Sequence, residues 1–358
     1  DGFSIYIRTE NDCSIPTVDY QIDTTSFRVE NINFEVGDLW QIEYGEEGFT
    51  QGNGTLQNVN TSNIVIDNLS KYTSYDVYVR TNCGNGIYSP WIKNNVVLNP
   101  YWTDIVTTQP EGYIEDANGN IEISSVEGLA WLSVLINGLH GHQPNNFKEK
   151  KVSLIADLNL NGYRWYPMGR YLNLEWTEFS GIFDGRGHSI YNIYVSDAGS
   201  NLGLFGNIRK AVIRNINMEG GSVSSTCEPI GDDPQYWLPS STIGGLIGEA
   251  SSCYEISNCH SSVNVAGNGG AGSLCGSIKS YEDNIKTSVF NCSSTGTVSG
   301  REACGGLIGM VYGDVEIRNC YATGDVFISV CNFDAWEMGR GGLVGSIRQN
   351  SSMYNCYS

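Results

Sequence analysis

Two patterns of apolar and polar positions divide the chain. In residues 26–30 and 39–44, apolar and polar side chains alternate with a period of two, and residues 63–69 are a third strand-like run. That period is typical of strands with one face in a core and the other in solvent. After about residue 200 the alternation gives way to short runs of Val, Ile, Ser and Asn between glycines. We therefore expect antiparallel strands in the first part and a repeated structure in the second.

A glycine-rich motif recurs through the second part. Residues 244–248 read Gly-Gly-Leu-Ile-Gly, residues 305–309 and 341–345 repeat this closely, and residues 272–276 and 203–206 are looser copies. Each copy is followed, 9 to 15 residues after its closing glycine, by an asparagine in an apolar-x-Asn sequence. These asparagines are Asn215, Asn258, Asn291, Asn319 and Asn355. Self-similarity at such a short period indicates a solenoid.

The residue types of the repeats favour one kind of solenoid. Gly, Ser, Asn, Val and Ile suit short parallel strands with tight bends better than the helices of ankyrin-type repeats. Stacked coils would lie about 4.8 Å apart, so equivalent side chains would form ladders. We expect the repeated asparagines to form one ladder at a bend, where Asn tolerates left-handed backbone and both donates and accepts hydrogen bonds. The glycines would allow a sharp corner and close packing. A second, inward ladder would be formed by Leu204, Leu246, Leu274, Leu307 and Leu343.

The first part of the chain resembles a known module. In residues 69–81 a leucine lies six positions before Tyr75, and an alternating run follows. This segment is similar to the end of fibronectin type III domains, where such a tyrosine caps the corner between two strands. The resemblance covers residues 13–109 and implies a β-sandwich with Trp40 in its core and residues 102–108 as its last strand.

The same resemblance extends to a pair of cysteines and to one long connection. Cys13 precedes the first strand and Cys83 follows the corner strand, as in bacterial surface variants of the family, which implies a disulfide between them. The connection formed by residues 88–101 is longer than the family's usual one. A structural spacer is the expected role of this module. The alternative is direct binding through the long connection, with Trp91 and Tyr101 exposed.

A single helical pattern, in residues 125–137, separates the two parts. Ser124 or Ser125 can cap its N-terminus, and Gly138 ends it. Stacked coils leave an open end whose core and strand edges must be covered. We therefore predict that this helix caps the N-terminal end of the solenoid.

The residues that lead into the repeats carry a second resemblance. Residues 152–162 and 179–190, with the Gly-Leu-x-Gly copies that follow, are similar to bacterial surface proteins with GLUG repeats. That resemblance covers residues 112–358 and implies extracellular exposure and adhesion, with no catalytic residues to carry over. The predicted fold is all-β: a fibronectin type III-like sandwich in residues 1–109 and a right-handed parallel β-helix in residues 110–358.

The amino-acid composition reduces the classes of binding partner to be considered. The 358 residues carry 39 Asp and Glu against 20 Lys and Arg, a formal net charge of −19, which disfavours nucleic acid and anionic membranes. No apolar run approaches the roughly 20 residues of a membrane helix. The start at Asp1 shows no signal-peptide pattern, so we expect a mature or trimmed product. Of the 11 cysteines, Cys259, Cys292, Cys320 and Cys356 follow the repeated asparagines, which favours a packing role.

Two insertions leave the solenoid at equivalent points and predict the binding face. They follow the strands that contain Val223 and Val326. Loops on a rigid solenoid usually carry binding, and aromatic rings beside carboxylates suit a sugar-binding groove. The candidate ligand-binding residues are Asp232, Asp233, Tyr236, Trp237, Phe333, Asp334 and Trp336. The lead-in adds Trp165, Tyr166, Tyr171 and Trp176. The alternative is that these rings fold back and plug the loops against the coils.

Metal and catalytic chemistry have less support. Asp232, Asp233 and Asp334 could hold calcium, but no calcium-loop spacing is present, so no cofactor is expected. His140 and His142 lack a third ligand nearby. A polysaccharide lyase or glycosidase would need a carboxylate pair or a base on one face. The nearest candidates, Asp157 and Asp184, lie in turns where Asp binds backbone N–H groups, and His188 follows a glycine turn where it would satisfy a backbone group.

We therefore predict a secreted or surface-anchored bacterial protein. Its function would be adhesion, through binding of a glycan or an extracellular protein on the loop face of a monomeric solenoid. The alternatives are a non-binding stalk segment of a larger surface protein and a carbohydrate-active enzyme.

Overall fold

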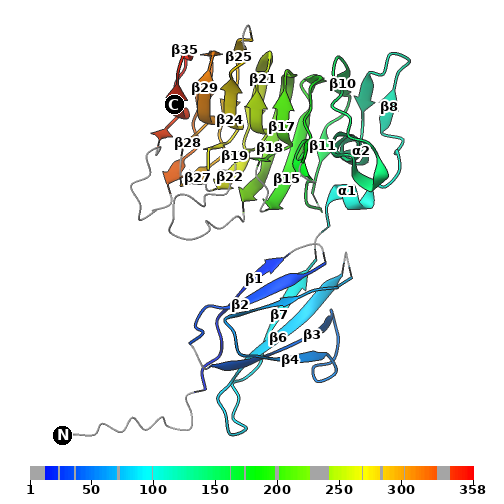
Figure 1. The fold of residues 1–358 in the computed structure, drawn as a ribbon, viewed down its shortest axis with the longest axis vertical. Coiled ribbons are helices and arrows are strands. Elements are labelled where there is room, and N and C mark those ends of the chain that lie inside the picture. The colour runs from blue at the N-terminus through cyan, green and yellow to red at the C-terminus, as the bar shows by residue number, and fades with distance from the viewer. Residues whose placement is uncertain are drawn as a thin grey trace, which may run out of the picture. The chain divides into compact units, whose positions relative to one another are not determined.

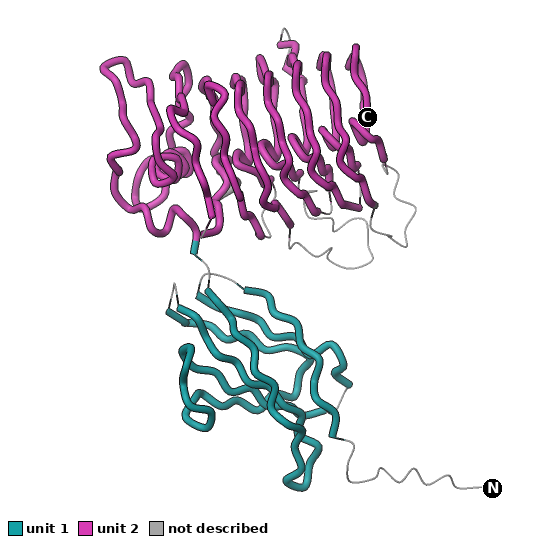
Figure 2. Tube along the Cα trace, turned by 180° about the vertical axis from the view of Figure 1, so that it is seen from behind, with its two compact units in different colours: residues 1–100 teal, residues 101–358 magenta. Residues whose placement is uncertain are grey.

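A computed structural model describes residues 13–22, 25–35, 38–70, 73–98, 100–161, 163–172, 175–197, 201–225, 242–267, 269–282, 285–301, 303–328 and 339–358. The chain is all-β and divides into two compact units, Asp1–Pro100 and Tyr101–Ser358. Figure 1 shows the strands of each unit, and Figure 2 separates the units by colour. None of the helices in these ranges has the length and apolar composition needed to cross a membrane.

Unit 1 consists of antiparallel strands in two sheets. The first sheet has the order β1 (Val18–Ile22), β2 (Phe27–Asn31), β5 (Asn63–Ile66). The second has the order β4 (Thr55–Val59), β3 (Leu39–Glu46), β6 (Ser74–Asn82), β7 (Ile92–Val97). Alternate side chains of these strands, such as Phe27 and Val29 in β2, fill the core between the sheets. The alternation in the sequence therefore reflects one buried and one exposed face.

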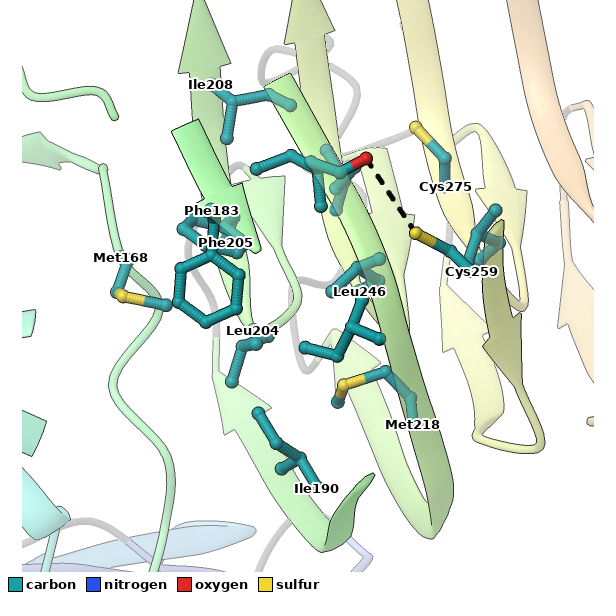
Figure 3. Packing of buried hydrophobic residues seen from close by; sticks show 14 of the residues in the cluster. Met168, Phe183, Ile190, Leu204, Phe205, Ile208, Met218, Leu246, Cys259 and Cys275 are labelled. Carbon is teal, nitrogen blue, oxygen red and sulfur yellow. Dashed lines mark hydrogen bonds between the residues drawn. The ribbon is translucent and has the colours of Figure 1, made fainter. Parts of the chain in front are cut away.

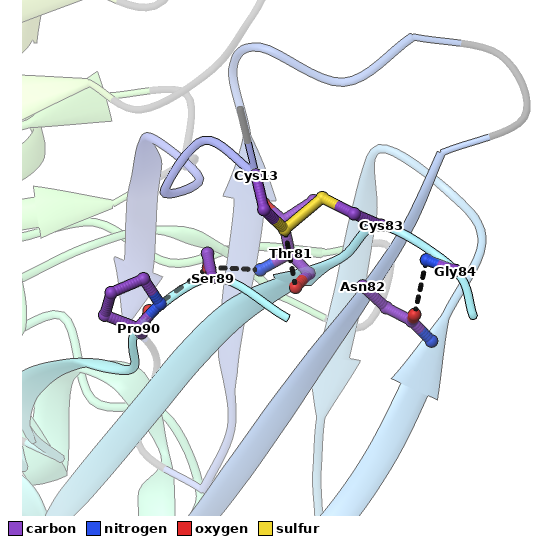
Figure 4. Close-up of a disulfide and its surroundings, with 7 residues drawn as sticks. All are labelled: Cys13, Thr81, Asn82, Cys83, Gly84, Ser89 and Pro90. Atoms are coloured by element: carbon purple, nitrogen blue, oxygen red, sulfur yellow. Dashed lines mark hydrogen bonds between the residues drawn. A yellow bond between two sulfur atoms is a disulfide. The ribbon is translucent and has the colours of Figure 1, made fainter. Parts of the chain in front are cut away.

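Unit 1 has a buried aromatic at each position expected from the sequence. Trp40 is buried, and its indole N–H donates to the carbonyl of Thr61. Tyr75 is also buried, and its hydroxyl accepts from the backbone N–H of Ser70, which holds the corner before β6. A disulfide joins Cys13 to Cys83 at the end of β6 (Figure 4).

The boundary between the units lies earlier than the predicted 109/110, and residues 102–108 are not the last strand of the sandwich. That strand is β7, inside the segment interpreted as a long connection. Residues 102–105 instead form the short helix α1 (Trp102–Ile105) in unit 2. The resemblance is misleading here because the Trp102 ring packs in the core of unit 2, where its indole N–H donates to the carbonyl of Leu160.

Unit 2 is built mainly of parallel strands in three large sheets, and successive turns of the chain add strands to the same sheets (Figure 1). Within the described residues the largest sheet has 16 strands. Its main path is β8 (Tyr113–Glu115), β9 (Ile121–Ile123), β10 (Lys151–Leu154), β14 (Ile182–Asp184), β18 (Val212–Ser225), β21 (Glu255–Ser261), β25 (Thr287–Phe290), β30 (Val315–Arg318) and β35 (Ser352–Tyr354). Beside this path lie β11 (Leu158–Asn159), β15 (Ser189–Asp197), β22 (Asn264–Gly267), β26 (Ser293–Ser294), β27 (Val298–Gly300), β31 (Tyr321–Ala322) and β32 (Val326–Ile328).

The other two sheets of the stack meet at the Gly-Gly-Leu-Ile-Gly motif. The strands before the motif's leucine are β16 (Asn201–Leu202), β19 (Thr242–Gly244), β23 (Ala271–Gly272), β28 (Cys304–Gly305) and β33 (Arg340–Gly341). The strands after it are β17 (Phe205–Arg209), β20 (Ile247–Ser251), β24 (Cys275–Ser280), β29 (Ile308–Gly313) and β34 (Val344–Arg348). A two-stranded antiparallel hairpin, β12 (Tyr171–Leu172) and β13 (Glu175–Trp176), projects from the lead-in.

The leucine of every motif copy points into one continuous core. Leu204, Leu246, Leu274 and Leu307 are fully buried, and Leu343 nearly so. Figure 3 shows Leu204 and Leu246 on successive coils among the other core side chains. The thiol of Cys259 also lies in this core and contacts the carbonyl of Ile213 on the preceding coil (Figure 3). Burying one apolar column per coil makes each coil depend on its neighbours.

The repeated asparagines form a hydrogen-bonded column that ends on a carboxylate. All five have left-handed backbone, with φ between 48° and 55°. The side-chain amide of each donates to the amide oxygen of the asparagine one coil earlier, at 3.0 to 3.4 Å. The first of them, Asn215, donates to Asp184 Oδ1 at 3.0 Å. Because the amides all point the same way, each bond polarises the next.

The glycines of the motif provide space and do not adopt left-handed backbone. Gly248 is representative: it has no positive φ, but a Cβ there would lie 2.7 Å from the carbonyl oxygen of Gly206 and from the amide nitrogen of Leu202. Any side chain would therefore push neighbouring coils apart.

The N-terminal end of the stack is covered as predicted from the sequence pattern. Helix α2 (Val126–Asn137) begins after Ser125, whose hydroxyl accepts from Gly128 N, and ends at Gly138, which has φ of 65°. A short 3₁₀ turn, η1 (Leu139–Gly141), follows. Leu129, Leu132 and other side chains of α2 are buried in the core of the coils. The antiparallel strand β8 pairs with β9 at the edge of the largest sheet.

Candidate ligand-binding groove

The loop residues predicted to bind a ligand cannot be placed. Asp232, Asp233, Tyr236, Trp237, Phe333, Asp334 and Trp336 all lie outside the described residues. The predicted binding face therefore remains a prediction.

The aromatic side chains predicted in the lead-in differ in burial and in their contacts. Trp165 is fully buried, and its indole N–H donates to the carbonyl of Leu204, so it belongs to the core. The Tyr166 ring lies edge-on to Tyr101 and beneath the Arg170 guanidinium. The side chain of Tyr171 lies outside the described residues. Trp176 differs from these, because 53% of its surface is exposed.

Trp176 borders a groove of about 390 Å³ on the outer surface of unit 2. The floor comes from the ends of β17, β20 and β24, which pair in parallel and bring Arg209, Ser251 and Lys279 into register. Each of these strands points an apolar side chain inward one residue earlier. The outward positions are therefore free to carry polar groups. The complete lining is Trp176, Thr177, Glu178, Asn207, Ile208, Arg209, Glu249, Ser251, Ser252, Lys279, Tyr281 and Glu282.

Two exposed aromatic rings belong to this groove, from segments more than 100 residues apart. Trp176 ends the hairpin strand β13, and Tyr281, 58% exposed, follows β24. The hairpin is attached to the fold through Thr177, whose buried hydroxyl donates to Asn137 Oδ1 of α2. The floor residue Asn207 is likewise fixed, since its amide donates to the carbonyl of Gly169. The residue after Trp176 and the floor at Asn207 are thus joined to the fold by hydrogen bonds.

Ion pairs cross the floor between coils. Lys279 Nζ lies 2.7 Å from Glu249 Oε2, and both groups are partly buried. Arg209 donates to Glu282 Oε1 through Nε at 3.1 Å and Nη2 at 2.6 Å. Lys210 lies beside the groove, with its Nζ 2.6 Å from Glu282 Oε2. Each pair presents donors and acceptors side by side.

The pair of Arg209 and Glu282 keeps both of its groups charged. Hydrogen bonds from Lys210 and Arg209 hold the pKa of Glu282 below its usual value. The hydrogen bond to Glu282 raises the pKa of Arg209, and the nearby negative charge of Glu178 adds to that shift. The floor therefore carries fixed charges at neutral pH.

The titratable residues considered for catalysis are engaged in local contacts. His188 Nδ1 lies 2.9 Å from Asp157 Oδ1, which also accepts from Ser189 N. His140 Nε2 lies 2.7 Å from the carbonyl of Thr103. His142 packs edge-on against the Trp131 ring. Across the described ranges, no three His, Cys, Asp or Glu side chains are grouped so as to hold a metal ion.

The alternative binding site predicted for residues 88–101 had Trp91 and Tyr101 exposed, but both side chains are partly buried, and Trp91 packs against Arg80. Its guanidinium lies 3.9 Å from the Tyr88 ring centroid and 4.3 Å from that of Trp91. Tyr101, by contrast, belongs to unit 2, where its hydroxyl donates to Asp197 Oδ2 at 2.7 Å. The two aromatics expected to act together at residues 88–101 are thus on different units.

Sequence reasoning missed the groove as a whole. It named Trp176 but not Glu178, Glu249, Lys279 or Tyr281, because these residues become neighbours only through the register of separate coils. The repeat itself contained the signal, since residues at equal distances after successive closing glycines lie side by side.

Comparison with known proteins adds distant similarities only. No protein-family description and no curated protein matches the chain. A crystal structure of a candidate immunoglobulin A1 protease from Bacteroides ovatus is 22% identical, with 68% of this chain and 76% of that chain covered and a TM-score of 0.48. Pectate lyase Pel3 from Pectobacterium carotovorum is 12% identical, with 94% and 98% covered and a TM-score of 0.24. Domains d3–d4 of the rat CD45 extracellular region are 18% identical, with 24% and 51% covered and a TM-score of 0.20. The chain is thus distantly similar to proteins of differing function.

Proposed function

We propose that this chain is a glycan-binding module of a secreted or surface-anchored bacterial protein. In this proposal, unit 1 is a fibronectin type III-like spacer, and unit 2 is a right-handed parallel β-helix of GLUG-type repeats that carries the binding groove. The observation that carries the proposal is the pair of exposed rings, Trp176 and Tyr281, on a groove whose floor is polar. Aromatic faces stack on the apolar faces of sugar rings, and paired donors and acceptors bind hydroxyl groups.

The extracellular location is supported by the Cys13–Cys83 disulfide, since such bonds persist in oxidising compartments. Binding is preferred to catalysis because the two carboxylates considered for an enzyme are engaged. Asp184 is held by Arg214 and Asn215, and Asp157 by His188 and Ser189.

A glycan array probed with the full chain and with Trp176→Ala tests the proposal. We expect the wild type to bind a subset of glycans and Trp176→Ala to lose about tenfold or more in affinity, the scale of one aromatic anchor. Tyr354→Ala is the matched control, because Tyr354 is 56% exposed but does not line the groove.

Absence of binding to any glycan would contradict the proposal and favour a stalk segment. The continuous stack of hydrogen-bonded coils is the feature that would suit a stalk. Equal binding by the wild type and Trp176→Ala would place the site elsewhere, with the predicted loops as the next candidates.

A further inference from the structure

The charges of the groove point to its ligand class. Resting on the proposed glycan-binding function, we propose that the groove selects uncharged saccharides and excludes acidic ones, because its own carboxylates occupy its cations.

The cations in and beside the groove already form ion pairs with carboxylates of the protein. Lys279 is paired with Glu249, while Arg209 and Lys210 both bind Glu282. These pairs join side chains about 30 or 70 residues apart in sequence, so they are fixed by the stacking of coils. An acidic sugar would have to share each of these three cations with a protein carboxylate.

The groove is lined by three carboxylates and two cations, and a third cation, Lys210, lies beside it. Glu178, Glu249 and Glu282 face Arg209 and Lys279. Glu178 accepts a hydrogen bond from the Ser180 hydroxyl at the long distance of 3.5 Å, and it lies near enough to Arg209 for its negative charge to raise the pKa of Arg209. A uronate or sialate carboxylate beside Glu178 would therefore meet a like charge, which opposes binding. The net charge of −19 on the chain acts in the same direction at longer range.

A neutral hydroxyl meets no such penalty. At the Lys279–Glu249 pair it can donate to the carboxylate and accept from the ammonium without breaking the ion pair. Hydrogen bonds with charged partners are stronger than those between neutral groups. Ser251 and Ser252 add hydroxyls along the same floor, and the rings of Trp176 and Tyr281 supply stacking surface. The groove thus offers a hydroxyl-rich ligand complementary contacts.

Isothermal titration with two ligands of one backbone tests the inference. The first is a neutral hexose oligosaccharide chosen from the array, and the second is the same oligosaccharide oxidised to a uronic acid at C6. We expect the wild type to bind the neutral form at least about tenfold more tightly, a difference of about 1.4 kcal/mol. Equal or tighter binding of the acidic form would overturn the inference but leave glycan binding intact.

Two variants sharpen the test. Glu249→Gln releases Lys279 and Glu178→Gln removes a carboxylate, so each should raise affinity for the acidic form about tenfold while changing the neutral form only a few-fold. Glu316→Gln breaks a similar ion pair with Lys286, 2.6 Å long, outside the groove, and should change neither affinity. A thermal melt verifies that each variant is folded.

No change with either groove variant would also overturn the inference. Failure of both ligands to bind, or binding of a peptide alone, would instead overturn the proposed function itself.

Discussion

The two units solve the same packing problem in different ways. The core of unit 1 is filled by side chains that follow no sequence repeat, such as Trp40 and Phe27. A disulfide between Cys13 and Cys83 links two distant parts of this unit. Unit 2 repeats one solution: an inward Leu, a bend Asn and a crowded glycine in each coil. Stability is thus distributed differently, since repeated coils interact mainly with their neighbours.

In unit 2, the inward positions of the strands form the core, and different, outward positions form the groove. Inward positions of β17, β20 and β24 are the buried Ile208, Ala250 and Ile278, which keep the core continuous. The next outward positions on the same strands need not resemble one another, and three of them contribute to the groove. The repeat thus fixes where a binding site can form without supplying its chemistry.

The largest expected effect concerns the disulfide of unit 1. Cys13→Ser/Cys83→Ser opens a link between residues 70 positions apart, which should destabilise unit 1 by about 4 kcal/mol. Calorimetry of the full chain should show the unit 1 transition at lower temperature and the unit 2 transition unchanged. Cys356→Ser, at a free and partly exposed thiol, serves as control. A shift of the unit 2 transition alone would contradict the assignment of this bond to unit 1.

A crowded glycine provides the converse test in unit 2. Gly248→Val places a side chain against backbone atoms of the preceding coil and should destabilise unit 2 by about 3 kcal/mol. Denaturant unfolding followed by far-UV circular dichroism would measure this loss. Gly187→Asn is the control, because Gly187 has open space around it and a left-handed backbone that Asn tolerates. An undiminished unit 2 in Gly248→Val would mean that the coils are not packed as described.

A smaller effect is expected at the end of the asparagine column. Asp184→Asn weakens the bonds to Arg214 and Lys151 and should cost about 2 kcal/mol in unit 2. Asp157→Asn, where the carboxylate is 57% exposed and screened by solvent, should cost clearly less. Equal losses in the two variants would show that the column gains nothing from ending on Asp184.

The same carboxylate predicts a pH dependence. Burial alone would raise the pKa of Asp184, but hydrogen bonds from Asn215, Arg186 and Arg214 outweigh it and lower the pKa to about 2. Because the unfolded value is near 3.9, its stabilisation is present above about pH 4 and is lost as the pH falls towards 2. Acid unfolding of unit 2 should therefore be less steep in Asp184→Asn than in the wild type.

The sequence predicted features that depend on local pattern. The helix after Ser125, the Leu and Asn ladders and the corner at Tyr75 follow from spacing or local resemblance. The short helix at Trp102 was missed because residues 102–108 were matched to the last strand of a fibronectin type III domain, whereas the Trp102 ring packs in the core of unit 2. The groove was missed for a related reason, since it unites Trp176, Glu249 and Tyr281 from separate coils.

The most direct test of the central claim is the affinity of Trp176→Ala/Tyr281→Ala for the best glycan from the array. If the ligand lies in the groove, each single variant should lose about tenfold and the double variant should show no measurable binding, with both thermal transitions unchanged. Wild-type affinity in a folded double variant would contradict the account.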